Sequence, residues 1–382
     1  MNPATSPGRP ELAGRSGRPV RFAVVGCGNI ARTHAAALAR LRELGDVELA
    51  AFVDVLPERA LGLGAQHGGP ARTWAETLAD DAVDAVTICT PSWTHAELAL
   101  AALAAGKHVV VEKPMDADLE AARRLRDAAR ASDRVLAVIS QHRFDPATED
   151  AARILAEGGL GTLVLVEARV PWWRPQSYYD ADPWRGTLAG DGGGALINQA
   201  IHMVDLMLAL AGPVASVQAI ATTRVHRIEV EDVIVASLRF ASGALGTLSA
   251  TTASAPGFPA RLSLAGDGGA LAIEGDALVL DERADGSRGA VAVPRLDAVA
   301  VAAGGSRSVS GAGAGDGAVA GRASGAGLAW GDAHERQLAD AVAAIRGGVA
   351  PRSGGGEGYV ALELVDAIYR AAREGRAIDL AP

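Results

Sequence analysis

The amino-acid sequence predicts an α/β domain with a doubly wound parallel sheet, followed by an α+β domain with a large, mostly antiparallel open sheet. Strand-like and helix-like segments alternate through residues 20–141, as in a parallel sheet covered by helices on both faces. From residue 163 onward, strand-like runs follow one another with short turns, as in an antiparallel sheet. The length of 382 residues also exceeds the roughly 100 to 200 residues of one domain, so two domains are expected.

The first strand and the turn after it carry the clearest motif. The apolar run Val20–Val25 is typical of a strand buried on both faces, and a helix is predicted over residues 30–44. Between them lies Gly26-Cys27-Gly28-Asn29-Ile30-Ala31, the G-x-G-x-x-A pattern of a Rossmann dinucleotide-binding fold. Gly26 would make the tight turn, Gly28 would let the backbone approach a pyrophosphate, and Ala31 would let the helix lie close to the strand.

The second predicted strand, residues 47–53, ends at Asp54. A carboxylate at this place can accept hydrogen bonds from both ribose hydroxyls and would repel a 2′-phosphate, so NAD fits better than NADP. The competing interpretation is an ordinary βαβ unit with a glycine turn and a solvated aspartate. The order of strand, glycine turn, helix, strand and acid favours the cofactor site.

The remaining elements of the first domain follow the same alternation. Helices are predicted over residues 57–67, 74–80, 95–105 and 119–131, and strands over residues 85–89, 108–111 and 135–140. This NAD-binding Rossmann domain is expected to span residues 19–142. Residues 1–18, rich in Pro, Gly, Arg and Ser, are expected to form a disordered leader.

Two motifs follow strands of this sheet at the edge where doubly wound folds bind ligands. Thr90-Pro91 follows one strand, and Glu112-Lys113-Pro114 follows the next. The Lys113 amine would reach the nicotinamide end of the cofactor. A water-poor pocket beside a positive charge lowers the pKa of an amine, which suits it to take a proton from an alcohol. The alternative is a surface lysine paired with Glu112.

The second domain, for substrate binding and oligomerisation, is expected over residues 143–356. Its strands are predicted at residues 163–170, 214–222, 233–240, 244–252, 261–265 and 270–273, and its helices at residues 148–157 and 195–211. We expect the helices to cover one face of the sheet and the other face to pair with another subunit.

The end of the chain has a different composition. Residues 284–327, dominated by Gly, Ala and Ser, are predicted to form a low-complexity loop without an assigned function. Helices are predicted over residues 335–345 and 358–373, and the segment 357–382 is counted as a separate C-terminal helix.

A glycine-rich stretch, residues 192–194, opens the helix predicted at 195–211. Asn198 and His202 are four residues apart and share one face, whereas Asp205 lies at a slightly different angle and is expected to meet a structural partner. A lone histidine on such a helix is more often structural than catalytic. Asn198 one turn earlier and the preceding glycines favour a ligand-facing role for His202.

Four segments, residues 26–34, 90–95, 112–114 and 192–206, together resemble the glucose–fructose oxidoreductase, inositol dehydrogenase and MocA family of NAD(P)-dependent oxidoreductases. The resemblance implies NAD as cofactor, a small-molecule sugar or polyol as substrate, and assembly into a homodimer or homotetramer through the C-terminal sheet. It also implies that Lys113 and His202 act on the reacting hydroxyl and that Asn198 helps to hold the substrate.

The candidate site residues fall into two groups. The cofactor candidates are Gly26, Gly28, Asn29, Ile30, Asp54, Thr90, Pro91, His95, Glu112 and Lys113. The substrate candidates are Asn198, Gln199, Arg185, Tyr178 and Trp173. Inositol-type members commonly carry Asp where this chain has Asn198, so the resemblance favours members that act on free sugars, anhydrosugars or nucleotide-linked uronic sugars.

The leading hypothesis is therefore an NAD-dependent dehydrogenase that oxidises a secondary hydroxyl of a sugar or sugar derivative. Two alternatives share the fold. Some relatives are NAD-dependent glycosidases that oxidise their substrate transiently, and a cofactor-sensing regulator would carry out no reaction. The presence of both Lys113 and His202 argues against the regulator, because a sensor has no use for that pair.

Composition limits the classes of binding partner and the cellular location that are expected. The net charge of −9, without a basic stripe, argues against nucleic acid as a partner. No apolar run is expected to reach the ~20 residues of a membrane span, and the N-terminus lacks a signal-peptide core. Only Cys27 and Cys89 are present, which argues against a disulfide framework and for a reducing, cytoplasmic location. We expect no metal.

Overall fold

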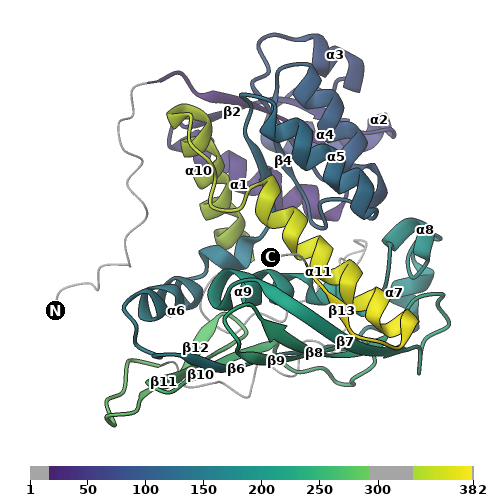
Figure 1. The fold of residues 1–382 in the computed structure, drawn as a ribbon. Helices are drawn as coiled ribbons and strands as arrows, with labels where there is room; N and C mark the ends of the chain where they lie inside the picture. The colour runs from purple at the N-terminus through teal and green to yellow at the C-terminus, as the bar shows by residue number, and fades with distance from the viewer. Residues whose placement is uncertain (1–16, 292–329, 381–382) are drawn as a thin grey trace, which may run out of the picture.

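The computed structural model describes residues 17–291 and 330–380. Within them lie a five-stranded sheet and an eight-stranded sheet. Figure 1 shows the five-stranded sheet and its helices above the larger sheet, with helix α11 (Gly355–Glu374) running between the two parts and helix α10 (Trp330–Gly347) beside the helix α1 (Asn29–Glu43) of the upper part. Most of the predicted leader, and the predicted loop at 284–327 beyond residue 291, lie outside the described residues.

The first sheet is parallel throughout, with the strand order β2-β1-β3-β4-β5. Its strands are β1 Val20–Val25, β2 Val47–Val53, β3 Ala85–Ile88, β4 His108–Val111 and β5 Leu136–Val138. Its helices are α1 Asn29–Glu43, α2 Pro57–His67, α3 Trp74–Ala79, α4 His95–Ala104 and α5 Leu119–Arg130. The predicted Rossmann architecture is confirmed. The last strand is shorter than expected because the chain enters a 3₁₀ turn at Gln141–Phe144.

The second sheet has the order β12-β11-β10-β6-β9-β8-β7-β13, and only the β6–β9 pair is parallel. Its strands are β6 Leu163–Pro171, β7 Val214–Thr222, β8 Val233–Phe240, β9 Leu245–Thr251, β10 Arg261–Gly266, β11 Gly269–Glu274, β12 Ala277–Arg283 and β13 Ile378–Asp379. The sequence analysis missed β12 and β13. The second of these is only two residues long and pairs with β7 from the far end of the chain.

The two faces of this sheet differ. Burial alternates along β8, as a half-exposed antiparallel strand requires. The helices α6 Pro146–Ala156, α9 Ile201–Ala211 and α11 Gly355–Glu374 lie on the face toward the parallel sheet (Figure 1). On the other face, exposed apolar side chains pair across strands, Ile220 with Val235 and Leu165 with Leu245.

The helix predicted at 195–211 starts with a π-helical turn, Leu196–Ala200, before α9 begins. The short helices α7 Gln176–Asp180 and α8 Leu188–Asp191 precede it. By length and composition alone, the 24-residue helical stretch 188–211 could span a membrane, although polar side chains interrupt it. Of its most apolar window, 72% is buried inside the fold, as in the core helix of a globular domain.

Helix α10 Trp330–Gly347 returns to the first domain. Its side chains Leu338, Ala341 and Val342 are buried in one cluster with apolar residues of β1 and α1. By sequence this helix falls within residues 143–356, yet by packing it completes the core of the parallel-sheet domain. This late segment therefore packs against the first domain, although it is distant from that domain in the sequence.

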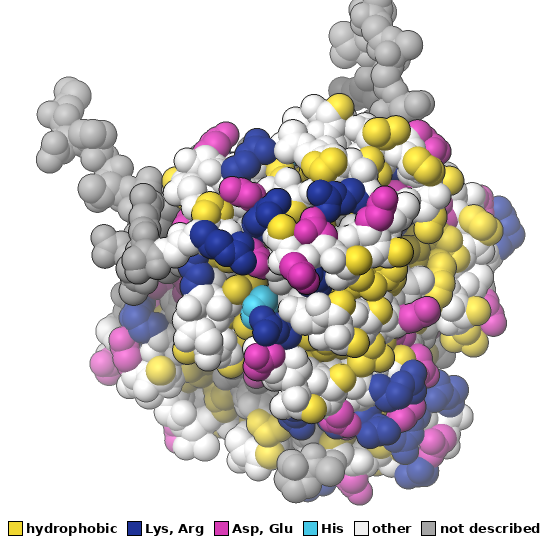
Figure 2. Space-filling view, turned by 90° about the horizontal axis from the view of Figure 1, so that it is seen from above, with side chains coloured by type: hydrophobic (Ala, Val, Ile, Leu, Met, Phe, Trp, Pro, Cys, Tyr) yellow, Lys and Arg dark blue, Asp and Glu magenta, His cyan; other side chains and the backbone are white. Residues whose placement is uncertain are grey.

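Figure 2 shows one outer face of the molecule. Basic and acidic side chains are interspersed over it, with apolar side chains between them. This face therefore carries no large patch of a single charge sign.

Candidate active site

A cavity of about 390 Å³ lies between the carboxyl edge of the parallel sheet and elements of the second domain. Most of the candidate residues from both ends of the chain line it. These are Ile30, Thr90, Pro91, His95, Glu112, Lys113, Trp173, Tyr178, Arg185, Asn198, Gln199 and His202. The cavity thus brings the predicted cofactor side and the predicted substrate side together. Gly26, Gly28, Asn29 and Asp54 are not among its lining residues.

The glycine loop has the shape that a dinucleotide needs. Gly26 has φ +82°, and a Cβ there would come within 2.8 Å of the Cys89 carbonyl. A Cβ at Gly28 would meet nothing within 4 Å, which leaves open space in front of the loop. Helix α1 begins at Asn29 without a side-chain cap and without an acidic residue in its first turn. Its free N–H groups therefore suit a pyrophosphate.

Asp54 lies beside this loop, as the motif predicts. Its Oδ2 accepts a hydrogen bond from the Cys27 amide at 2.7 Å, and its Oδ1 accepts one from the Leu56 amide at 2.9 Å. Each carboxylate oxygen retains a second lone pair for a ribose hydroxyl. The residues present fit an NAD molecule.

His95 holds the two motif loops together. Its ring nitrogens lie 2.8 Å from the Pro114 carbonyl and 2.9 Å from the Thr90 carbonyl. The side chain is buried and has hydrogen-bond partners at both nitrogens. Its observed role is therefore to fix the relative position of the two loops, and direct contact with a cofactor stays a prediction.

Lys113 is half-buried and points across the cavity to the second domain. Its Nζ donates a hydrogen bond to the Asn198 carbonyl at 2.9 Å. Burial lowers the pKa of Lys113, and the Arg174 charge lowers it further, while Glu112 and Asp191 oppose the shift. The alternative of a surface lysine paired with Glu112 is wrong, because the amine turns away from that carboxylate to a backbone oxygen.

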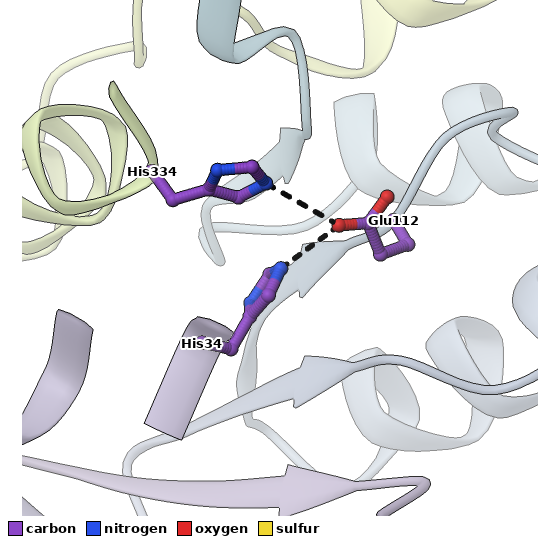
Figure 3. A group of neighbouring side chains, drawn as sticks. All are labelled: His34, Glu112 and His334. Atoms are coloured by element: carbon purple, nitrogen blue, oxygen red, sulfur yellow. Dashed lines mark hydrogen bonds and ion pairs between the residues drawn. The ribbon is translucent and has the colours of Figure 1, made fainter. Parts of the chain in front are cut away.

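Glu112 is held by two histidines from distant helices (Figure 3). The His34 Nε2 from α1 lies 2.9 Å from Glu112 Oε1, and the His334 Nε2 from α10 lies 3.8 Å from it. Burial by itself would raise the pKa of the Glu112 carboxyl, but the hydrogen bonds from both histidines hold it well below its usual range. The other oxygen accepts the Lys113 amide at 3.0 Å, so the cluster anchors the backbone of the lysine.

His202 lines the same cavity as Lys113. Burial lowers the pKa of His202 well below its usual range, and the charges of Lys113 and His142 add to this, so the ring is neutral at pH 7. Asp205 turns away and accepts two hydrogen bonds of 2.7 Å from Arg143. The structural partner expected for this aspartate is confirmed.

Cationic and aromatic side chains form the substrate wall. The Arg185 guanidinium lies 4.7 Å from the centre of the Tyr178 ring, and its Nε donates to Asp182 at 2.8 Å. Arg174 stacks near Trp172 and Tyr178, and within the described residues no carboxylate forms an ion pair with it. This wall therefore keeps one positive charge without a countercharge.

Three buried polar atoms on lining residues have no hydrogen-bond partner within the described ranges. They are Gln141 Oε1, Gln199 Oε1 and Trp172 Nε1. An unpaired buried polar group costs about 1–3 kcal/mol, so such groups are expected to find a partner when a ligand binds. Two acceptors and one donor suit a ligand with several hydroxyl groups.

Several lining residues were missed from the sequence, namely Gln141, His142, Asp145, Trp172, Arg174, Asp276 and His334. The segment 141–145 follows β5 at the same sheet edge as Thr90 and Glu112. Those two residues were predicted because ligands bind at the carboxyl ends of parallel strands, and the same reasoning applies to this segment. Asp276 and His334 come from a hairpin turn and a late helix. No local pattern marks either of them.

The comparisons with known proteins agree with this geometry. Residues 20–140 match the family model described as oxidoreductase family, NAD-binding Rossmann fold, and residues 148–272 match the GFO/IDH/MocA C-terminal domain. The chain is 28% identical to inositol 2-dehydrogenase of Rhizobium meliloti over 95% of this chain and 99% of that protein. It is also 28% identical to levoglucosan dehydrogenase of Pseudarthrobacter phenanthrenivorans, over 47% of this chain and 52% of that protein.

Among solved structures, the chain is similar to the WlbA dehydrogenase from Bordetella pertussis in complex with NADH and UDP-GlcNAcA. The sequence identity is 32%, the TM-score is 0.77, and the match covers 96% of this chain and 100% of that one. The likeness thus extends over both domains.

Proposed function

The chain belongs to the GFO/IDH/MocA family of oxidoreductases, and from this premise we propose that it oxidises a secondary hydroxyl of a sugar or sugar derivative with NAD. The observation that carries the proposal is the cavity in which Lys113 and His202 meet beside a loop that fits a dinucleotide. When bound, NAD supplies the acceptor for the hydride. The Gly26 to Ile30 segment and Asp54 would hold its phosphates and ribose.

The residues of the cavity divide the remaining work. Burial lowers the pKa of Lys113, which favours the free amine, and the Asn198 carbonyl orients that amine through one N–H bond. The lone pair of the amine then takes the proton of the substrate hydroxyl as a general base. The neutral His202 ring forms a hydrogen bond with the oxygen of the same hydroxyl.

The walls favour a polyhydroxylated substrate with a negative group. Hydroxyls of the ligand would satisfy the unpaired atoms of Gln141, Gln199 and Trp172. Arg174, which lacks a carboxylate partner among the described residues, would pair with an anionic substituent. A nucleotide-linked uronic sugar meets both conditions, and the similarity to an enzyme solved with UDP-GlcNAcA supports it.

The test is NADH production by the purified protein with NAD and a panel of free sugars, cyclitols, anhydrosugars and UDP-linked uronic sugars. We expect turnover with the anionic nucleotide sugar and little with cyclitols. The matched control is Arg174→Gln, which should raise KM for the anionic substrate more than for a neutral one. The absence of NADH with every member would contradict the proposal. Release of the aglycone from an aryl glycoside without net NADH would indicate the glycosidase instead.

The uncovered face of the second sheet supports a homo-oligomer. The pairs Ile220–Val235 and Leu165–Leu245 present apolar surface that a second copy of the chain would bury. Ile220→Arg should shift the sedimentation coefficient toward that of a monomer. A wild-type protein that sediments as a monomer would refute this. The two cysteines, Cys27 and Cys89, are free, which supports a reducing, cytoplasmic location.

A further inference from the structure

A histidine–carboxylate pair lies in the cavity wall without a role in the proposed function. His142 belongs to the 3₁₀ turn after β5, and Asp145 directly precedes α6. The His142 Nδ1 lies 2.6 Å from Asp145 Oδ2. Both residues line the cavity that contains Lys113 and His202.

The short contact determines which tautomer the neutral His142 ring adopts. An ionised carboxylate can only accept a hydrogen bond, so the neutral His142 ring carries its proton on Nδ1 and a lone pair on Nε2. A carboxylate at this position also stabilises the imidazolium that forms when Nε2 accepts a proton. His142 is therefore built to act as a proton acceptor.

The His142 ring lies next to the ring of His202 in the cavity. The rings of His142 and His202 have their centres 5.1 Å apart at an interplanar angle of 88°. Hydrogen bonds that serve a reaction are often long in the ligand-free protein and tighten when the substrate binds. The His142 side chain is 30% exposed, so the pair connects His202 with solvent.

The proposed function creates a need for such a connection. Oxidation of the hydroxyl transfers the O–H proton to the Lys113 amine, and the resulting ammonium must lose that proton before the next turnover. Lys113 is half-buried, and its Nζ faces the Asn198 carbonyl. Among the described residues of the cavity, His202 and His142 have adjacent rings, and these two imidazoles offer a route from the amine to water.

We propose that His142, supported by Asp145, receives the substrate proton through His202 and releases it to water. The ammonium of Lys113 gives its proton to one nitrogen of His202. The other nitrogen of His202 gives its own proton to His142 Nε2, which restores neutral Lys113 and leaves His202 neutral as its other tautomer. A flip of the His202 ring then returns a lone pair toward Lys113 for the next turnover. The His142 imidazolium then loses a proton to water, so charge and atoms balance. The inference rests on the proposed function.

Other charged groups face this pair. Asp276, in the turn between β11 and β12, lines the same cavity, and its negative charge favours a transient imidazolium. The Arg336 Nη2 from α10 lies 3.5 Å from Asp145 Oδ1. From α9, His202 faces the ring of His142.

The first arm of the test needs no substrate. Ring nitrogen NMR of the ¹⁵N-histidine-labelled full chain should show His142 protonated at Nδ1, with His142→Gln providing the assignment. Asp145→Asn should reduce the population of this tautomer. A wild-type His142 protonated at Nε2 would overturn the proposal, whatever substrate the enzyme uses.

The second arm compares one turnover with many, using a sugar that the wild type oxidises. His142→Gln and Asp145→Asn should leave the rate of the first turnover within about twofold, lower steady-state turnover by about tenfold, and recover when imidazole buffer is added. His67→Gln, on α2 outside the cavity, is the control. Unfolding midpoints check that each variant folds.

The outcomes separate the two proposals. Equal loss of the first and later turnovers, or unchanged turnover in both folded variants, would refute the relay while the dehydrogenase assignment stands. If either His142→Gln or Asp145→Asn fails to fold, the turnover of the other variant tests the relay. A wild type that oxidises no sugar would refute the proposed function, and the NMR arm would still report on the pair.

Discussion

Two of the histidine–carboxylate pairs among the described residues differ in their surroundings. His34 and Glu112 lie 2.9 Å apart, and His142 and Asp145 lie 2.6 Å apart; both carboxylates come from chain that follows a parallel strand. The His34 and Glu112 side chains are 0% and 7% exposed, whereas His142 is 30% exposed. Nearly the same pair therefore serves two ends. The pair that is shielded from solvent holds a backbone in place, whereas the pair with the more exposed histidine is the one that we propose exchanges protons with water.

The lysine between the two sites should show the largest effect. Lys113→Ala should lower turnover by roughly 10² to 10⁴, the usual contribution of a positioned base, and leave NAD binding nearly unchanged. Steady-state kinetics and a fluorescence titration with NAD measure the two quantities. Unchanged turnover would reduce Lys113 to a cofactor contact and remove the reason for a proton path.

The enclosed site should contribute more to stability than the open one. Glu112→Ala leaves two buried histidines without their shared acceptor, so the free energy of unfolding should fall by about 1–3 kcal/mol. Asp145→Ala should cost less, because water can reach His142. Urea unfolding of both variants measures the difference. Equal losses of unfolding free energy in the two variants would show that the enclosed site is not the more stabilising one.

Asp54 is a third carboxylate, held by backbone amides instead of histidines. Wild-type protein should bind NAD more tightly than NADP, because the carboxylate repels a 2′-phosphate. The double change Asp54→Ser with Val55→Arg should shift the ratio of the two affinities by about tenfold or more toward NADP. Calorimetric titration with both cofactors tests this, and tighter NADP binding by the wild type would contradict it.

His202 should show the smallest effect on stability, and one that depends on pH. His202→Ala should lower kcat/KM for the alcohol, yet shift the unfolding midpoint by no more than about two degrees near pH 7.5. The folded state keeps the ring neutral because its pKa is lowered, whereas the unfolded chain binds a proton near the usual His pKa of about 6.5.

The wild type should therefore lose stability as the pH falls below about 6.5, and the variant should lose less. Thermal unfolding at about pH 7.5 and pH 5.5 measures the two slopes. Parallel slopes would mean that His202 is not held neutral in the folded protein.

Local patterns in the sequence were sufficient for the parallel sheet, for all strands of the second sheet except β12 and β13, and for one side of the site. The strands β2, β7 and β8 begin and end at the predicted residues, because runs of buried or alternating apolar side chains and the turns that bound them are local features. Gly26 and Asp54 were found in the same way. A φ of +82° requires a glycine at the turn, and an acidic residue that directly follows a strand is visible within a few residues.

The tertiary structure alone decided which groups meet in space. Glu112 and His334 are far apart in the chain, and their contact depends on α10 packing against α1. Arg174 forms no ion pair with a carboxylate among the described residues, and its place in the cavity wall, like that of Asp276, follows from how the second sheet sits over the first. Periodicity reports which side of an element is buried, but not which distant element covers it. The partners, protonation and exposure of the histidines therefore became visible only in the folded chain.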